Sequence, residues 1–241
     1  MENYQAVFKR KELKYLLTEA QLAALRPVLF SHTVPDAFAH SSILNLYYDT
    51  PDFRMIHRSQ EKPAYKEKLR LRSYGVPQEQ TPVFPEIKKK AEGIVYKRRV
   101  GMPCRDAVLY LSRQGPGGDD QIFRELDWML SSYGSLAPRI FLSYERDSRK
   151  GAEDPSLRLT LDRRMLWRAD ALDLRQGAWG SPLLAPGQVL LEVKITNAAP
   201  LWLARALSEN GIFPTSFSKC SRAFEALCKE KTDETEIKRY A

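Results

Sequence analysis

The sequence predicts an α+β fold, in which a closed antiparallel β-barrel has helices packed on its outside. Three observations lead to this prediction. Several segments alternate apolar and polar residues with a period of two, which is typical of strands. The polar side of these segments carries mostly lysine and arginine. Segments with the apolar spacing of amphipathic helices lie between and after them.

The predicted strands cover residues 7–17, 42–48, 65–74, 83–90, 94–100, 139–147, 157–163 and 189–196. Segment 65–74 has the clearest alternation, because Leu69 and Leu71 occupy one face. The other face holds four cations, namely Lys66, Lys68, Arg70 and Arg72. Residues 91–93 are few enough to form a hairpin loop between two of the strands.

Helices are predicted from capping signals and apolar stripes. Thr18 and Gln21 can form a capping box at the start of a helix whose stripe is Leu22, Leu25 and Leu29. Further helices are expected at 105–113 and 120–132, after Pro200, and after Ser218. We expect one domain over residues 1–241, with residues 229–241 as a flexible tail.

The composition excludes several classes of protein. The chain has 241 residues, of which 43% are hydrophobic and 28% are charged, as in folded globular proteins. No apolar run is long enough for a membrane span, and residues 1–10 lack the apolar core of a secretory signal, so a cytoplasmic location is expected. Three scattered cysteines and three histidines disfavour disulfide and zinc scaffolds. We therefore assign no chemistry to Cys220, Cys228 or His57.

The charge balance indicates an anionic partner. Lysine and arginine total 38 against 30 acidic residues, which gives a net charge of +8. Twelve cations of the strand faces and of the last helix could account for this excess: Lys14, Lys66, Lys68, Arg70, Arg72, Lys88, Lys97, Arg99, Arg146, Arg158, Lys194 and Lys219. The carboxylates among them are Glu12, Glu86, Asp162 and Glu192. An open sheet with a solvated charged face is the simpler alternative. A barrel with these charges inside would form a polar tunnel suited to a polyanion.

A tunnel of this kind favours phosphate chemistry. Arginine suits forked contacts to phosphate oxygens, and lysine acts as a point charge. The few carboxylates fit a hard divalent ion, Mg²⁺ or Mn²⁺, that bridges phosphate oxygens. Glu192 is the first candidate metal ligand and Glu12 the second. For Glu192 a structural salt bridge is an equally good interpretation.

Nine short motifs carry a resemblance to a known family. In chain order they are Lys14-Tyr15, Tyr47-Tyr48-Asp49, Arg70-Leu71-Arg72-Ser73-Tyr74-Gly75, Glu86-Ile87-Lys88, Lys97, Tyr144-Glu145-Arg146, Arg158-Leu159-Thr160-Leu161-Asp162, Leu191-Glu192-Val193-Lys194 and Phe217-Ser218-Lys219. They resemble the polyphosphate polymerase (VTC) domain of the vacuolar transporter chaperone complex, within the triphosphate tunnel metalloenzymes. The resemblance runs over residues 8–227. One departure is Ser216, where the eukaryotic polymerases carry a further lysine.

The resemblance implies an eight-stranded antiparallel triphosphate tunnel that transfers the γ-phosphoryl of ATP to a growing polyphosphate chain, with Mn²⁺ or Mg²⁺ as the cofactor. The phosphate-binding residues that the resemblance implies are Lys14, Arg70, Arg72, Lys88, Lys97, Arg146, Arg158, Lys194 and Lys219. Lys68, which belongs to the same row of cations as Arg70 and Arg72, is predicted to bind phosphate as well. Arg70 and Arg72 would hold the nucleotide phosphates, Glu192 the metal ion, and Lys194 with Lys219 the acceptor phosphate. These five are the predicted catalytic residues.

Alternative functions remain open from the sequence. Water could replace the chain end as acceptor, which would make the protein a tunnel-type triphosphatase. A non-catalytic module that binds polyphosphate or inositol phosphates would keep the cations without needing a metal ligand. A nucleic-acid binder is disfavoured, because the aromatic residues lie mostly on apolar faces and not among the cations. A membrane-protein partner and the oligomeric state are left open.

Overall fold

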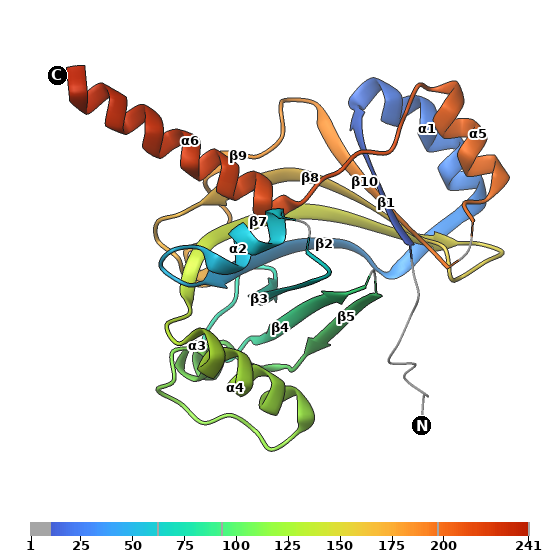
Figure 1. Cartoon of the computed structure of the whole chain (residues 1–241). Coiled ribbons are helices and arrows are strands. Elements are labelled where there is room, and N and C mark those ends of the chain that lie inside the picture. The colour runs from blue at the N-terminus through green and yellow to red at the C-terminus, as the bar shows by residue number, and fades with distance from the viewer. Residues whose placement is uncertain (1–10, 62, 93, 197, 241) are drawn as a thin grey trace. The chain divides into compact units, whose positions relative to one another are not determined.

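The computed structural model describes residues 11–61, 63–92, 94–196 and 198–240, with side chains described as far as residue 232. In chain order the elements are β1 (Lys11–Thr18), α1 (Glu19–His32), β2 (Thr33–Asp49), α2 (Arg54–Gln60), β3 (Tyr65–Tyr74), β4 (Pro82–Ala91), β5 (Ile94–Arg99), β6 (Met102–Pro103), α3 (Cys104–Leu111), α4 (Gln121–Tyr133), β7 (Ala137–Gly151), β8 (Arg158–Arg168), the 3₁₀ turn η1 (Leu174–Gln176), β9 (Ser181–Pro182), β10 (Gln188–Ile195), α5 (Leu201–Glu209) and α6 (Lys219–Tyr240). Figure 1 shows these elements along the chain.

The predicted α+β class with a large antiparallel sheet is confirmed. Hydrogen-bonded strands follow one another in the order β1-β10-β8-β7-β2-β3-β4-β5, with β6 beside β4 and β9 beside β8. Closure of this sheet into an eight-stranded barrel stays a prediction. Residues 7–10 of the first expected strand lie outside the described residues, and the range 229–241, expected to be a flexible tail, overlaps the helix α6.

The chain forms two compact units. The first unit comprises residues 1–42, 144–165 and 184–217, and the second comprises residues 43–143, 166–183 and 218–241. Strands β2, β7 and β8 each begin in one unit and end in the other. The single domain expected from the sequence stays a prediction.

The core of the first unit lies between its strands and the helices α1 and α5, which lie side by side (Figure 1). The capping box predicted for α1 is present: Gln21 N donates to Thr18 Oγ1 at 3.2 Å, and Thr18 N donates to Gln21 Oε1 at 3.0 Å. The α1 stripe packs against inward residues of β1, β8 and β10, among them Leu17 and Leu191. This packing leaves the opposite face of β1, β8 and β10 to the charged residues at alternate positions.

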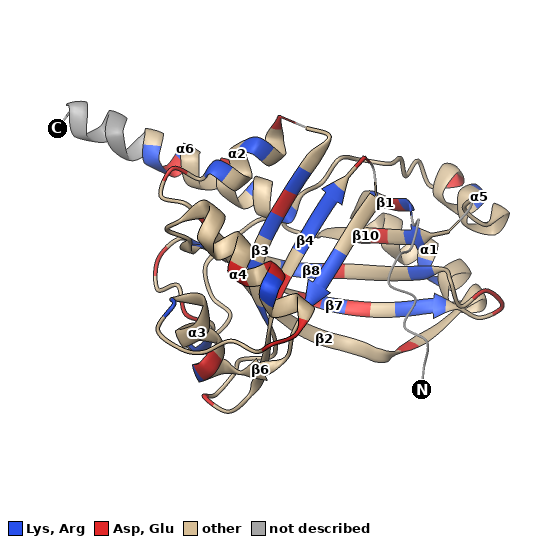
Figure 2. Ribbon diagram, turned by 60° about the horizontal axis from the view of Figure 1, so that its bottom comes forward, with Lys and Arg blue, Asp and Glu red and all other residues tan. Residues whose placement is uncertain are grey.

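In the second unit, helices α3 and α4 cover the apolar face of β3 and β4. Leu69, Leu71 and Ile87 are each at most 1% exposed and belong to one core cluster with α4 residues such as Leu126. Asp120 caps α4 by accepting hydrogen bonds from the next backbone amides, as its type and position predict. The other face of β3, β4 and β5 carries the row of cations, seen as blue bands in Figure 2.

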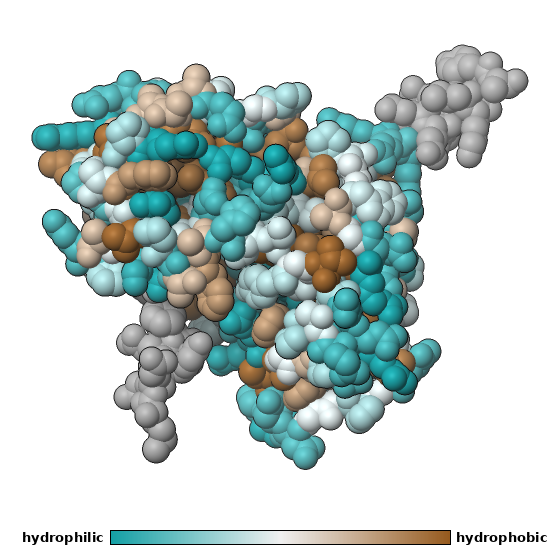
Figure 3. Space-filling view, turned by 180° about the vertical axis from the view of Figure 1, so that it is seen from behind, coloured by the Kyte–Doolittle hydropathy of each residue, from teal (hydrophilic) through white to brown (hydrophobic). Residues whose placement is uncertain are grey.

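Exposed hydrophobic residues are scattered over the surface. On the face in Figure 3 they form separate brown spots among hydrophilic residues. Among the helices that the structure describes, none combines the length and the apolar character needed to cross a lipid bilayer.

Candidate functional site

One group of charges centres on a buried glutamate of β4. Glu86 is 1% exposed. Both Arg70 Nε and Arg70 Nη2 lie 2.7 Å from Glu86 Oε2, and Lys97 Nζ lies 2.8 Å from Glu86 Oε1. Arg72 Nε and Arg99 Nη1 follow at 3.7 and 3.9 Å. We call these five residues the Glu86 cluster.

Strand pairing explains why this cluster forms. In the antiparallel register Arg70 of β3 lies opposite Glu86 of β4, and Glu86 lies opposite Arg99 of β5. Two further side chains orient the arginines: Arg72 Nε donates to Asn45 Oδ1 at 2.9 Å, and Arg70 Nη1 donates to Tyr47 OH at 3.3 Å. The guanidinium groups are therefore oriented before any ligand arrives.

The Glu86 cluster makes stability depend on pH. Burial disfavours the ionised carboxylate, but the surrounding Arg70, Arg72 and Lys97 outweigh it and lower the pKa of Glu86 to about 2. Because the folded pKa lies below the unfolded one, this contribution, about 3 kcal/mol, is present above about pH 4.5 and is lost as the pH falls toward 2. We expect urea unfolding of wild type and of Glu86→Gln to differ by a constant free energy from pH 7 to 5. The difference should shrink at lower pH, and parallel curves down to pH 2 would contradict the assignment.

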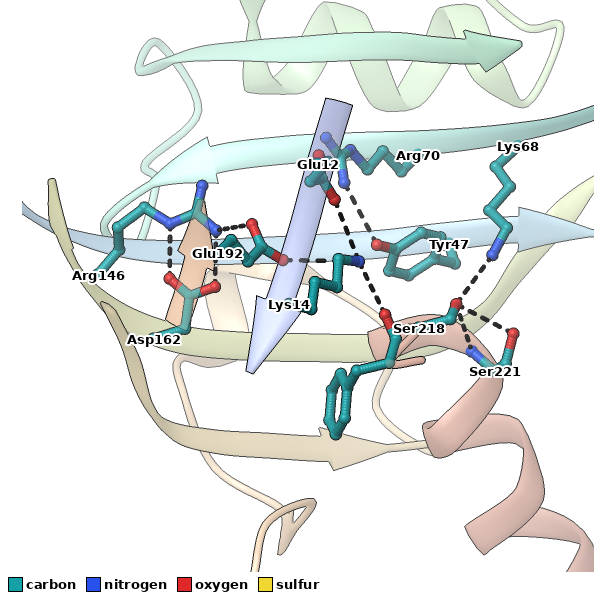
Figure 4. A network of polar contacts seen from close by, with 11 residues as sticks. Glu12, Lys14, Tyr47, Lys68, Arg70, Arg146, Asp162, Glu192, Ser218 and Ser221 are labelled. Carbon is teal, nitrogen blue, oxygen red and sulfur yellow. Dashed lines mark hydrogen bonds and ion pairs between the residues drawn. The ribbon is translucent and has the colours of Figure 1, made fainter. Parts of the chain in front are cut away.

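A second group of charges centres on Glu192 of β10, which is 6% exposed. Arg146 on β7 donates both Nε and Nη2 to the carboxylate of Asp162, each at 2.6 Å. The same Nη2 lies 3.2 Å from Glu192 Oε2 (Figure 4). Because Asp162 is fully buried and bound through two parallel bonds, it fixes the guanidinium of Arg146.

Lys14 of β1 also belongs to this group, because it contacts the second carboxylate oxygen of Glu192. Its Nζ lies 3.2 Å from Glu12 Oε1 and 3.8 Å from Glu192 Oε1, and it donates to the Phe217 carbonyl at 2.7 Å (Figure 4). Pairing of β1 with β10 puts Lys14 directly opposite Glu192. We call Glu12, Lys14, Arg146, Asp162 and Glu192 the Glu192 cluster.

Two other predicted residues lie in the first unit beside the Glu192 cluster. Lys194 is opposite Glu12 on β1 and opposite Arg158 on β8 in the strand register. Among the residues that the structure describes, Lys194 has no carboxylate within ion-pair distance. Arg158 pairs with Asp36 through Nη1, while its Nε is buried without a hydrogen-bond partner among the described residues.

The remaining predicted residues lie in the second unit. Lys68 Nζ donates to Ser218 Oγ at 3.3 Å, next to the start of α6 (Figure 4). Lys219 is the first residue of α6, and the positive end of a helix dipole favours anions. Lys88 is exposed and lies between Lys68 and Lys97 in the strand register. The predicted residues thus lie in two sets, one in each unit.

The donor set of the Glu192 cluster fits a Mg²⁺-type ion. Glu12 and Glu192 are diagonal neighbours on one face of β1 and β10, and both contact the ammonium of Lys14. Mg²⁺ is commonly bound by one or two carboxylates, with water and substrate phosphates as the other ligands. No group of three or more His, Cys, Asp or Glu side chains suited to a metal occurs among the described residues. A site in which two carboxylates hold the ion and phosphate oxygens supply further ligands agrees with the ligand preference of Mg²⁺ and needs no third acidic side chain.

Three buried polar residues were not among the predicted site residues. Glu86 and Asp162 hold the key arginines, and Asn45 orients Arg72. For both carboxylates a signal existed, since Glu86 shares a face with Lys88 and Asp162 shares one with Arg158. Asn45 is a polar residue in an otherwise apolar strand segment. Because its side chain is buried, it needs a hydrogen-bond partner.

Each cluster, taken by itself, offers oriented cationic groups to an anion. Each presents guanidinium and ammonium groups that buried carboxylates hold in place. The clusters contain no hydroxyl, thiol or imidazole group that could serve as a nucleophile. This chemistry suits electrostatic stabilisation of transferred phosphoryl groups more than covalent catalysis.

Comparison with known proteins gives a family match. The model of the family described as the VTC domain matches residues 9–228. No curated protein matches the chain.

Solved structures with a similar fold exist at low sequence identity. A candidate adenylate cyclase from Bacillus halodurans matches with a TM-score of 0.55 and 15% identity, over 88% of this chain and 96% of that chain. A candidate adenylyl cyclase from Hippeastrum, described as having a dominant triphosphatase activity, matches with a TM-score of 0.50 and 14% identity, over 89% of this chain and 95% of that chain. At these identities the likeness shows the fold alone.

Proposed function

The chain belongs to the VTC domain family and shares its fold with the two solved structures described above, and from this premise we propose that it is a cytoplasmic polyphosphate polymerase of the triphosphate tunnel type. In the proposed reaction the γ-phosphoryl of ATP is transferred to the end of a growing polyphosphate chain, and Mn²⁺ or Mg²⁺ is the cofactor. The observation that carries the proposal is that buried carboxylates hold arginines in fixed orientations in both clusters.

Arg70 and Arg72 are the proposed ligands of the nucleotide phosphates. Phosphoryl transfer spreads negative charge over the equatorial oxygens of the transferred group, so fixed cations stabilise its transition state. Glu86 and Asn45 already orient these guanidiniums, so little reorganisation is needed when ATP binds. Lys14, Lys68, Lys88, Lys97, Arg146 and Arg158 are the further proposed phosphate contacts.

Lys194 and Lys219 are the proposed contacts of the acceptor phosphate. Lys194 forms no ion pair with a carboxylate of a described residue, so it can bind phosphate without breaking such a pair. Lys219 adds its charge to the N-terminal amides of α6, which favour a negative ligand. The acceptor is therefore positioned by charge. Its terminal phosphate oxygen attacks the γ-phosphorus of ATP directly, the bond from that phosphorus to the β–γ bridging oxygen breaks, and ADP leaves with the electron pair.

Glu192 and Glu12 are the proposed ligands of the metal ion. When bound, the ion supplies positive charge to phosphate oxygens. Lys14 keeps its hydrogen bond to the Phe217 carbonyl in this arrangement, so its ammonium retains a partner when the two carboxylates bind a cation. Arg146 likewise keeps a partner, because its two hydrogen bonds to Asp162 do not involve Glu192 or Glu12.

ATP and polyphosphate are the proposed ligands, and nucleic acid is not. Single-stranded nucleic acids are bound by exposed aromatic rings on which bases stack. Three tyrosines beside the two clusters are buried and therefore unavailable for stacking: Tyr15 is 4% exposed, Tyr47 7% and Tyr144 4%. Tyr74 is the exposed exception at 46%, and its OH accepts a hydrogen bond from Arg99.

A gel assay tests the proposed activity. Purified full-length chain with ATP and Mn²⁺ is expected to produce a ladder of polyphosphate on a polyacrylamide gel. Release of orthophosphate without a ladder would assign the protein as a triphosphatase. Binding of polyphosphate without either product would assign it as a non-catalytic binding module.

A further inference from the structure

One acidic residue interrupts the row of cations on the charged face of β3, β4 and β5. On this face, residues 66, 68, 70, 72, 88, 90, 97 and 99 are lysine or arginine and residue 86 is glutamate, while Phe84 and Val95 are apolar. Lys97 lies opposite Lys88, which lies opposite Lys68. Like charges facing one another across strands disfavour the protonated ammonium.

Lys97 of this row is in direct contact with the glutamate. Its Nζ contacts Glu86 Oε1 at 2.8 Å. The charged or titratable groups that face it or its partner from the packed strands are Tyr47 of β2, Arg70 and Arg72 of β3, Glu86 and Lys88 of β4, and Arg99 of β5. Burial, Arg72 and Arg70 lower the pKa of Lys97 and Glu86 raises it, and the net result is a pKa of about 8, although 42% of the Lys97 side chain is exposed.

The position of Glu86 fits a role beyond a simple ion pair. A neutral amine at position 97 would contribute no charge to a phosphate, and Lys97 is among the proposed phosphate contacts. Glu86 is almost fully buried and remains ionised at neutral pH, because the adjacent Arg70 and Arg72 hold its pKa near 2. Its negative charge is therefore constant over the range in which Lys97 titrates.

We propose that Glu86 is a positioning residue that keeps Lys97 protonated and so able to bind phosphate. The proposal rests on the proposed function only in taking a phosphate chain as the ligand. Glu86 itself touches cations and need not touch the phosphate. It acts through Lys97, and its loss should change the pH at which anion binding declines.

The test measures binding of inorganic tripolyphosphate to the full-length chain by calorimetry, with EDTA present so that no turnover occurs. Wild-type affinity is expected to decline as the pH rises through about 8. In Glu86→Gln the decline should move down by about one pH unit or more, because the opposing charge is gone. Glu86→Asp retains the carboxylate and should restore most of the wild-type profile.

Lys97→Arg is the matched control, because arginine stays charged throughout this range. The titration of tripolyphosphate itself changes the affinity of all variants in the same way. Apart from this shared effect, the affinity of Lys97→Arg should not decline near pH 8. The double variant Glu86→Gln/Lys97→Arg should show the same flat profile. Thermal unfolding confirms that each variant is folded, and if Glu86→Gln is not, the comparison of wild type with Lys97→Arg and Glu86→Asp carries the test.

Two results would overturn the positioning role: identical pH profiles for wild type and Glu86→Gln, or a wild-type decline that persists in Lys97→Arg. The outcome is separable from that of the polymerase assay, because binding is measured without metal. If the protein binds tripolyphosphate but makes no polymer, the role of Glu86 stands and the polymerase assignment is wrong. Absence of tripolyphosphate binding at every pH would overturn both.

Discussion

Replacing Glu192 by glutamine is expected to lower ATP turnover by about 100-fold or more, because the amide cannot supply the negative charge that a divalent ion needs. Affinity for metal-free tripolyphosphate should stay the same or rise. Glu192 neutralises Arg146 and Lys14 in the free protein, at 3.2 and 3.8 Å, and glutamine would leave both more available to an anion. Turnover and anion affinity are therefore predicted to change differently.

Glu145→Gln is the matched control for this prediction. Glu145 lies in the same unit and also pairs with an arginine, since Arg164 Nη1 is 3.0 Å from its Oε1, but the pair is exposed. This variant should retain wild-type turnover. If Glu192→Gln instead keeps turnover within threefold of wild type, Glu192 is a structural partner of Arg146 and the metal assignment is wrong. Loss of both turnover and anion binding would indicate misfolding, which thermal unfolding would detect.

The faces of the strands could be predicted from sequence because a strand has only two sides. In β3 the buried Leu69 and Leu71 alternate with Arg70 and Arg72, and the structure places the two pairs on opposite faces, as the period of two requires. The capping box of α1 was predictable for a similar reason, since it depends on residues three positions apart. Local rules thus identified most of the elements.

The partners of the charged residues could not be predicted from sequence. Which carboxylate meets which cation depends on strand order and register, and these depend on contacts between distant segments. Lys14 and Glu192 are directly opposite in the structure but far apart in the chain. The sequence therefore identified Glu192 as a candidate ligand, but it did not reveal that Glu86 and Asp162 fix the arginines.

Among the segments that were missed, the first part of one strand and one helix have identifiable physical reasons. The first part of β2, residues 33–41, is mostly exposed and lacks an apolar alternation that would predict a strand. Helix α2 begins after Phe53, which has a left-handed conformation with φ of 54° and no side-chain cap. Its amides are capped instead by Asp49, which enters the sequence analysis only as part of the motif Tyr47-Tyr48-Asp49.

Replacing Asp49 by alanine is expected to destabilise the protein by about 3–5 kcal/mol, because three buried amides lose their acceptor. The Asp49 carboxylate is fully buried and accepts from the amides of Thr50, Met55 and Ile56 at 2.8, 2.9 and 3.0 Å. Urea unfolding measures the change. The effect should extend to function, because α2 packs against the helix that begins with Lys219.

The contact between α2 and α6 is aromatic: the rings of Phe53 and His57 both lie 5.0 Å from that of Phe224. Asp52→Ala is the control, because Asp52 lies in the same turn but is exposed, and it should leave stability nearly unchanged. Asp49→Asn should fall between the two, since its amide oxygen can still accept while its NH₂ group would face a backbone donor. If Asp49→Ala unfolds at the same urea concentration as Asp52→Ala, the cap does not stabilise α2. The position of Lys219 would then depend on other contacts.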